Sequence, residues 1–388
     1  MTLPTRNELY QANIARLEAQ YSITIPAIER NFLVVWAAVN AGTSWLLYKA
    51  LAKVQKNAFP DTADPESKGG TLERFGRVVL GRNPNPATAA FYEIQITADP
   101  SAIGNVIPAF TQWKSNDESL NPNKLYQLDT AHTILTTSDT ITVRAIETGL
   151  DSQLTPGNVV RLTGPIPLVE RNSSVTTETV TPLAAEDIEL YRQLILDNYR
   201  LEPQGGSGSD YRLWANDTQG VAQSYPYSNT TDSDTVDLYI EATIADSTDG
   251  KGTPTTAILA AVEVSVEDPT IDRPGRKPTT DKVNYQPITP RDIDIVVTGY
   301  QNLTPVIEQN IFDTIKNYLD DVRPFIGSID VPALQNDFFD TNRIVLLIME
   351  SNPQSVFTSV ELQVDGFSQN SITFDFGNIP FLNSVSYV

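Results

Sequence analysis

The stretch NFLVVWAAVNAGTSWLLYKAL, residues 31–51, decides how the start of this 388-residue chain folds. As a helix it is long enough to cross a bilayer, which takes about 20 apolar residues. Polar and small residues (Asn40, Gly42, Thr43 and Ser44) nevertheless fall together in its middle, where groups facing lipid are costly. A helix that is apolar on most sides can equally be buried among other helices. We therefore predict a bundle helix, with a membrane anchor as the alternative.

An apolar stripe precedes this stretch. Its members are Tyr10, Ile14, Leu17 and Tyr21, at spacings of four, three and four, which puts them on one helical face. Pro26 is expected to open the apolar helix, which fades near Phe59, and a short helix is expected over residues 71–79. So much apolar surface without an adjacent sheet must be buried against partner chains. The residues expected at that interface are Tyr10, Ile14, Leu17, Tyr21, Phe32, Val35, Trp36, Val39, Leu46 and Leu47.

From about Phe91 the apolar period changes to two. Tyr92, Ile94 and Ile96 alternate with polar residues, and Ile141 and Val143 do the same later. Turn clusters such as Pro156-Gly157-Asn158 separate these short segments. The pattern predicts an all-β block that ends near Leu168.

A mixed region follows the β block. Thr181 and Pro182 are expected to cap a helix with an apolar face of Ile188, Tyr191, Leu194 and Ile195. Pro203 and the Gly-rich run 204–208 are expected to end it. A strand is predicted over residues 236–244, a helix or a strand over 257–266, and a linker or extended crossover over 268–290.

The last hundred residues mix helix and strand. Ile293, Ile295 and Val297 alternate as a strand, and Thr304 with Pro305 predicts the start of a helix. Further strands are expected over residues 343–349, 356–364 and 372–388, in a β-α-β-β arrangement. The fold class is therefore α+β multidomain. Its expected parts are an N-terminal helical arm (1–82), a β-rich middle domain (83–175), an α/β insert-like domain (176–286) and a small C-terminal α+β domain (287–388).

Composition narrows the function. The chain has 27 Lys plus Arg against 48 Asp plus Glu, a net charge of -21, so it should repel nucleic acid and anionic membrane surfaces. Cys is absent, which removes disulfides, thiolate nucleophiles and cysteine metal sites. The one His, His132, lies in a polar stretch beside an expected strand and reads as a surface or loop residue.

Three groups of residues in the sequence could carry chemistry. The run 204–209 lacks the Lys-Ser/Thr of a phosphate loop and is expected to end a helix where such a loop would begin one, so a flexible connection is predicted. The acidic residues Asp232, Asp234, Asp237, Asp246 and Asp249 do not match a calcium-loop spacing and read as solvated turn carboxylates. A pair of carboxylates could serve a glycosidase, so an acidic β-rich carbohydrate-binding protein or hydrolase is the alternative function. No cofactor and no metal are expected.

A series of short motifs resembles the baseplate J-like family along nearly the whole chain. The N-terminal part contains Phe59-Pro60-Asp61-Thr62-Ala63, Leu72-Glu73-Arg74-Phe75-Gly76 and Arg82-Asn83-Pro84. The most specific portion contains Glu186-Asp187, Tyr191-Arg192, Pro203, Gly205-Gly206, Asp210-Tyr211, Trp214-Ala215 and Gly220-Val221. Asp272-Arg273-Pro274 and Asn378-Ile379-Pro380-Phe381-Leu382 follow. Two departures stand out, because Phe110 and Phe91 replace glycines that are common in the family.

This resemblance implies a structural wedge subunit of a contractile tail or injection machine, not an enzyme. Such a subunit pairs with a second copy of itself, and its N-terminal helices join a bundle with other wedge proteins. The paired copies close a ring around the tail hub or spike proteins, and that ring couples target contact to sheath contraction. The expected location is the tail baseplate of a virion or injection apparatus, assembled in the host cytoplasm, with no nucleic acid and no membrane as partner.

Overall fold

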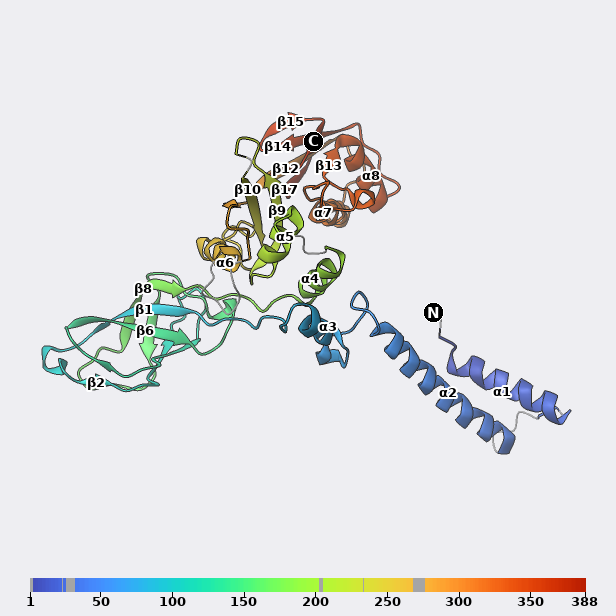
Figure 1. The fold of residues 1–388 in the computed structure, drawn as a ribbon, viewed down its shortest axis with the longest axis horizontal. Coiled ribbons are helices and arrows are strands. Elements are labelled where there is room, and N and C mark those ends of the chain that lie inside the picture. Colours follow the sequence, from blue (N-terminus) through green and yellow to red (C-terminus); the bar gives the residue numbers. More distant parts are fainter. Residues whose placement is uncertain (1–2, 23, 26–31, 202–204, 233, 268–275) are drawn as a thin grey trace. The chain divides into compact units, whose positions relative to one another are not determined.

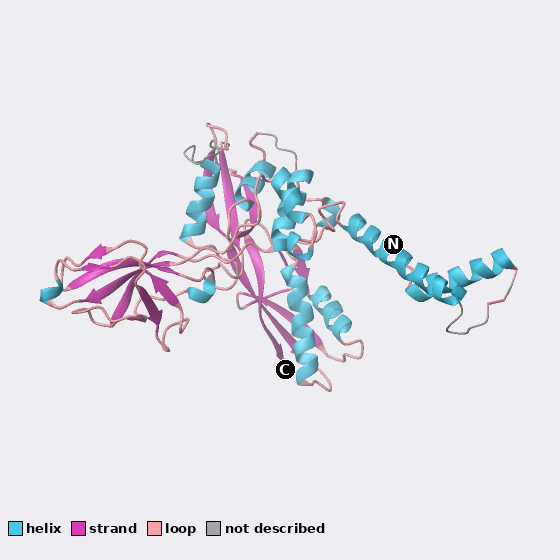
Figure 2. Ribbon diagram, turned by 90° about the horizontal axis from the view of Figure 1, so that it is seen from below, coloured by secondary structure: helices cyan, strands magenta, loops and turns pink. Residues whose placement is uncertain are grey.

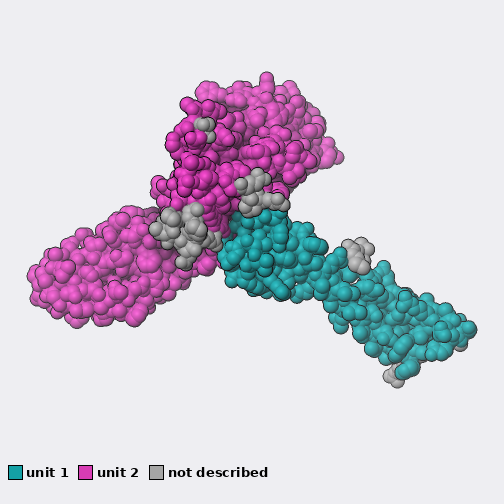
Figure 3. Space-filling model, in the orientation of Figure 1, with its two compact units in different colours: residues 1–83, 191–199 teal, residues 84–190, 200–388 magenta. Residues whose placement is uncertain are grey.

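The computed structural model describes residues 3–22, 24–25, 32–201, 205–232, 234–267 and 276–388. It is a mixture of helices and strands, as a multidomain α+β chain requires (Figure 1). The chain forms two compact units (Figure 3). Unit 1 comprises residues 1–83 and 191–199, and unit 2 comprises residues 84–190 and 200–388. The residues outside this description include Pro26, Asn31, Pro203, Gln204 and Asp272-Arg273-Pro274.

Unit 1 contains helices and, among the described residues, no strand (Figure 2). Its elements are α1 (Arg6–Tyr21), α2 (Phe32–Lys56), the short 3-10 helix Glu66–Lys68, α3 (Leu72–Val79) and most of α4 (Ile188–Arg200). The Thr5 side chain accepts from the Glu8 N–H and the Glu8 carboxylate accepts from the Thr5 N–H, so a capping box fixes the start of α1. The helices expected over residues 31–51 and 71–79 are confirmed as α2 and α3, and α2 continues to Lys56.

A closed six-stranded barrel opens unit 2, with the strand order β1-β6-β4-β3-β7-β8. Its strands are β1 (Phe91–Thr97), β3 (Gln112–Ser115), β4 (Leu125–Gln127), β6 (Ser138–Ala145), β7 (Val159–Leu162) and β8 (Asn172–Val180), and β2 (Val106–Ile107) pairs with β5 (His132–Thr133) beside it. The predicted alternation is confirmed, because Tyr92, Ile94 and Ile96 are buried and so are Ile141 and Val143. The expected end of the block near Leu168 is wrong, since β8 pairs with β1 up to Val180 and closes the barrel.

Phe110, one of the two departures from the family pattern, lies at a turn whose backbone conformation favours glycine. Its backbone has φ +66°, in the left-handed region that glycine tolerates best. The turn therefore keeps the geometry of a glycine turn although a bulky residue occupies it. Phe91, the other departure, begins β1, where extended backbone suits an aromatic residue.

Glu178 supplies a pH-dependent contribution to the stability of the barrel. Burial raises the pKa of Glu178, although hydrogen bonds from Tyr92 (3.4 Å between Oη and Oε1) and Gln153 oppose the shift. Because the folded-state pKa lies above the unfolded one, this stabilisation is present at pH values below the unfolded pKa of about 4.3 and is lost as the pH rises through the folded pKa. We expect the urea midpoint of Glu178→Gln, compared with that of the wild type, to be higher at pH 8 than at pH 4.5, because only the wild type loses this stabilisation as the pH rises. An equal difference at both pH values would contradict this assignment.

The middle of unit 2 is a three-stranded sheet in the order β11-β10-β9, covered by helices. Its elements are α5 (Gly208–Asn216), β9 (Val221–Ser228), β10 (Thr235–Ala242), α6 (Thr256–Glu267) and β11 (Lys282–Pro287). β9 and β10 are antiparallel, whereas β10 and β11 are parallel and α6 makes the crossover between them. Ile258, Val262 and Val266 of α6 pack on Leu238 and Ile240 of β10.

In this region the structure decides one open prediction and corrects two others. Residues 257–266, left open between helix and strand, are helix α6. Residues 282–287 of the expected linker form β11, because Val283 and Tyr285 pack against the core of the sheet. Thr181 and Pro182 do not cap α4, which begins at Ile188, and Asp187 Oδ1 accepts there from the N–H groups of Glu189 and Leu190.

The end of unit 2 is a four-stranded sheet in the order β15-β14-β12-β17 with two helices on it. The sheet contains β12 (Thr289–Thr298), β14 (Ser359–Val364), β15 (Phe367–Gln369) and β17 (Asn378–Tyr387), and the helices are α7 (Pro305–Asp320) and α8 (Thr341–Ser351). β13 (Phe338–Asp340) and β16 (Ser371–Thr373) pair as a separate two-stranded sheet. The cap of α7 by Thr304 with Pro305 at its first turn is confirmed. The strand expected over residues 343–349, and with it the β-α-β-β order, is wrong. Those residues lie in α8, where Asp340 caps the helix and Ile344, Leu347 and Ile348 are buried at helical spacing.

Candidate assembly site

The hairpin of α1 and α2, which we call the arm, is the first candidate site. The two helices pack against each other, and Asn13 Nδ2 donates to the Ala37 carbonyl at 3.3 Å. Ala37 and Ala41 are the fully buried residues of α2, whereas α1 has none. On the α2 side the contact is therefore made through small side chains, and most of the large apolar side chains of α2 are left exposed. No helix among the described residues is long and apolar enough to span a membrane.

The ten residues predicted for the interface all lie on this hairpin. Tyr10, Ile14 and Leu17 are half-buried, and the other seven have exposed fractions from 48% at Trp36 to 75% at Phe32. An open groove brings Tyr10 of α1 together with Val35, Val39 and Leu46 of α2. The prediction missed Leu51 and Val54, which are also exposed and which continue the spacing of four and three from Leu47. That spacing in the sequence could have identified them. Whether partner chains cover this surface stays a prediction.

The base of the arm brings several of the quoted motifs together within unit 1. Arg192 Nη1 donates to the carbonyls of Pro60 (2.5 Å) and Ala63 (2.8 Å), and the Tyr191 hydroxyl donates to the Arg82 carbonyl at 2.7 Å. A Cβ added to Gly76 of α3 would lie 1.7 Å from Tyr191 Oη, so only glycine lets α3 approach α4 this closely. The stretch from Pro60 to Arg82 thus meets Tyr191 and Arg192, which lie more than a hundred residues further along the chain.

A buried polar junction links the central sheet to the segment that follows α7. Arg212 of α5, whose side chain is 3% exposed, pairs with Asp330 and also donates to the Ser224 carbonyl at 3.1 Å. Glu241 of β10 accepts from Arg323 (3.1 and 3.2 Å) and from the Tyr225 hydroxyl (2.6 Å). Burial, reinforced by the Glu241 charge, raises the pKa of Tyr225 well above its usual value, so the phenol remains a donor.

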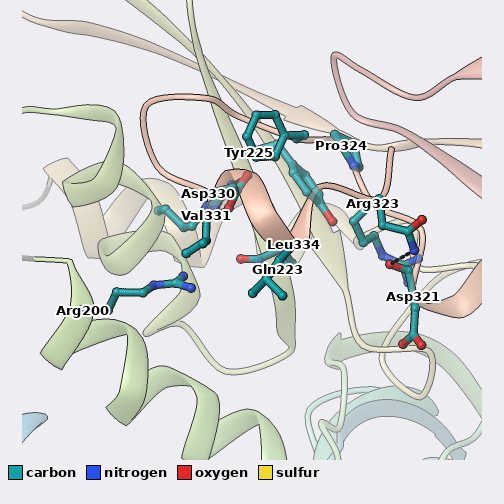
Figure 4. A pocket seen from close by; sticks show the side chains of 12 residues that line it. Arg200, Gln223, Tyr225, Asp321, Arg323, Pro324, Asp330, Val331 and Leu334 are labelled. Carbon is teal, nitrogen blue, oxygen red and sulfur yellow. Dashed lines mark hydrogen bonds and ion pairs between the residues drawn. The ribbon is translucent and has the colours of Figure 1, made fainter. Parts of the chain in front are cut away.

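A small pocket of about 150 Å³ opens beside this junction (Figure 4). Side chains of Arg200, Tyr225, Arg323 and Asp330 line it. The apolar residues Leu213, Ile288, Ile326 and Ile329 form a core cluster next to these ion pairs. The charges of Arg212, Asp330 and Arg323 are matched by ion pairs, with Glu241 as the partner of Arg323. This pairing indicates that the junction stabilises the fold.

The other candidates for chemistry have local structural partners. His132 is not in a loop but in β5, half-buried, and Nε2 lies 3.0 Å from Asp139 Oδ2. The Gly-rich run opens a helix and does not end one, because Ser207 caps α5. The N–H groups of Gly206 (2.6 Å) and Ser207 (3.1 Å) point at Asp210 Oδ2, where a phosphate loop would point them at its ligand.

The acidic turns are likewise occupied by their own chain. Asp249 accepts from the N–H groups of Lys251 and Thr253, and Asp246 accepts from Ala184 N–H. Asp232 pairs with Lys282 at 3.1 Å. No group of three or more His, Cys, Asp or Glu residues suited to a metal ion occurs in the part of the chain that the structure describes.

The central sheet is the part of this chain that matches a known protein family. The family model described as "Baseplate J-like central domain" matches residues 203–287, the region of α5, β9, β10, α6 and β11. No curated protein sequence matches the chain. A chain in the cryo-EM structure of the anti-feeding prophage (AFP) baseplate, 6-fold symmetrised, is similar at 10% identity and a TM-score of 0.43, with 100% of both chains covered. The match covers the part of the sequence resemblance from Pro203 onward, so residues 203–287 are a baseplate J-like central domain.

Proposed function

We propose that this protein is a structural wedge subunit in the baseplate of a contractile phage tail or a related injection apparatus. The observation that carries the proposal is the exposed apolar surface of the arm on a chain with a baseplate J-like central domain. Large exposed apolar patches mark sites of protein association. A subunit whose arm is completed by its neighbours has this property, and a catalytic role does not require it.

The proposed partners follow from the family resemblance. The protein pairs with a second copy of itself, its arm joins helices of other wedge proteins, and the pairs close a ring around the tail hub or spike. Rearrangement of the ring passes target contact to the sheath. A closed ring needs two different contact surfaces on each chain, and the arm supplies one of them. The protein acts in the tail baseplate after assembly in the host cytoplasm.

Removing the arm tests the proposal. A chain that lacks residues 1–56 keeps Pro60 and Ala63, so the contacts of Arg192 at the base of the arm survive. We expect this truncated chain to remain folded by circular dichroism and to lose its association with the other wedge proteins in size-exclusion chromatography with light scattering. Normal assembly of the truncated chain would refute the role given to the arm.

A single charge in the arm should have a similar effect on association. Leu46→Glu places a carboxylate on an exposed apolar position, so it should leave the unfolding midpoint of the isolated chain unchanged. It should weaken association roughly tenfold or more, because burying a leucine contributes about 1.5–3 kcal/mol. Gln55→Glu, which adds the same charge to an exposed polar position of α2, is the matched control and should bind normally. Equal losses in the two variants would mean that charge, not apolar contact, explains the result.

A further inference from the structure

The central sheet ends in a strand whose outer edge is open. β11 pairs in parallel with β10 on one side only. The Lys282 N–H donates to the Asp234 carbonyl (2.8 Å) and the Ile288 N–H to the Ile240 carbonyl (3.1 Å), so the even-numbered residues of β11 face β10. The N–H and C=O groups of Val283 and Tyr285 therefore point outward, and within the described part of the chain they have no hydrogen-bond partner.

Helix α6 overhangs this edge and makes it a groove. Ile258, Val262 and Val266 face the sheet, whereas a second stripe of α6 faces outward over β11. The groove is lined by Thr256, Leu259, Ala260 and Glu263 of α6 and by Val283 and Tyr285 of β11, together with the polar side chains beside them. It thus combines free backbone groups with apolar side chains above them, which is the arrangement that binds an added strand.

The charge of the groove restricts its occupant. Glu263 is exposed, and none of the ion pairs between described residues includes it. Across the groove, Tyr285 donates its hydroxyl to Glu267 at 2.9 Å, and Glu267 is already paired with Lys277 at 3.5 Å. Glu263 is therefore the one charged side chain among the described residues that line the groove. A cationic side chain is the complement of this surface. Because this chain carries 48 acidic against 27 basic residues, a segment of a different protein is the better source of that cation.

We propose that the groove between β11 and α6 binds an extended segment of a different protein as a fourth strand of the central sheet. The segment pairs with the outward backbone groups of Val283 and Tyr285. Its apolar side chains lie under Leu259 and Ala260, and a Lys or Arg lies beside Glu263. This site is separate from the arm, and it would stand even if the arm had another role.

The test uses the full chain and a fluorescein-labelled nine-residue peptide in which valine and threonine alternate around a central lysine. Fluorescence anisotropy should show saturable binding, and N-methylation of the peptide backbone on the pairing side should abolish it. Glu263→Lys should weaken binding about fivefold or more, as loss of a rim ion pair of about 1 kcal/mol implies. Glu350→Lys, the same charge change on an exposed position of α8, should leave binding unchanged.

Three outcomes would overturn the proposal. The first is absence of saturable binding, or binding that survives N-methylation. The second is an equal loss in Glu263→Lys and Glu350→Lys, which would indicate general electrostatic attraction to an acidic chain. The third is self-association of the full chain that Glu263→Lys abolishes in sedimentation experiments, because the occupant would then be a second copy.

Discussion

Replacement of Arg212 by methionine is expected to lower the free energy of unfolding of unit 2 by about 3 kcal/mol. The change removes the guanidinium that pairs with Asp330 and donates to the Ser224 carbonyl, and it leaves a carboxylate without its counter-charge. The loss of stability should lie at the lower end of the range for buried ion pairs, because the Asp330 side chain is 23% exposed. The measurement is the urea midpoint of the transition followed by tyrosine and tryptophan fluorescence.

Two further variants make this result specific. In Lys316→Met the lost pair, with Asp320, has side chains 48% and 57% exposed, so the cost should be below about 0.5 kcal/mol. Combining Arg212→Met with Asp330→Asn should recover part of the loss, because the amide oxygen can still accept from the Ile326 N–H and the unpaired charge is gone. A double variant that is less stable than Arg212→Met would show that the carboxylate itself, not its pairing, stabilises the junction.

Replacement of Gly76 by alanine is expected to loosen the base of the arm and to destabilise unit 1 by about 3 kcal/mol. The new methyl group would lie 1.7 Å from Tyr191 Oη and 2.3 Å from Cζ, so the ring or the whole of α3 must move. Movement of the ring breaks the hydrogen bond from Tyr191 to the Arg82 carbonyl. Hydrogen exchange of α3 and α4 measures the effect directly.

Gly42 provides the matched control in the same unit. A Cβ at Gly42 of α2 would meet no atom within 4 Å, so Gly42→Ala should stabilise the helix by roughly 0.5–1 kcal/mol. In a Tyr191→Leu background the ring is gone, and Gly76→Ala should then cost little beyond Tyr191→Leu alone. If Gly76→Ala is equally harmful with and without the tyrosine ring, the close approach of α3 to Tyr191 is not its cause.

Predictions from sequence succeeded where one local pattern dominated. The alternation of Tyr92, Ile94 and Ile96 was enough for β1, and Thr304 with Pro305 was enough for the start of α7. They failed where a short apolar run is compatible with both the strand period of two and the helical period of about 3.6. Residues 343–349 contain consecutive apolar side chains that suit a strand, and the Asp340 cap and the burial of one helical face decide for α8.

The strand β11 failed for a different reason. Its six residues are half polar and follow a region rich in Pro and Gly, so nothing local distinguishes them from a linker. They become a strand because β10 offers an edge to pair with and α6 offers an apolar surface for Val283 and Tyr285. Such long-range pairing is a property of the assembled sheet.

The sequence by itself determined that the chain begins with helices whose apolar surface exceeds what they can bury, and that a β block with period-two alternation follows. It also contained the residues that a baseplate J-like central domain shares, because such motifs depend on residue identity and order. Only the tertiary structure decided that Gly76, Arg82 and the 60–63 segment meet Tyr191 and Arg192, and that the Gly-rich run opens α5. It alone revealed the open edge of β11. The physical reason is that apolar periodicity acts over a few residues, whereas close approach, ion pairing and sheet edges depend on segments that lie dozens to more than a hundred residues apart.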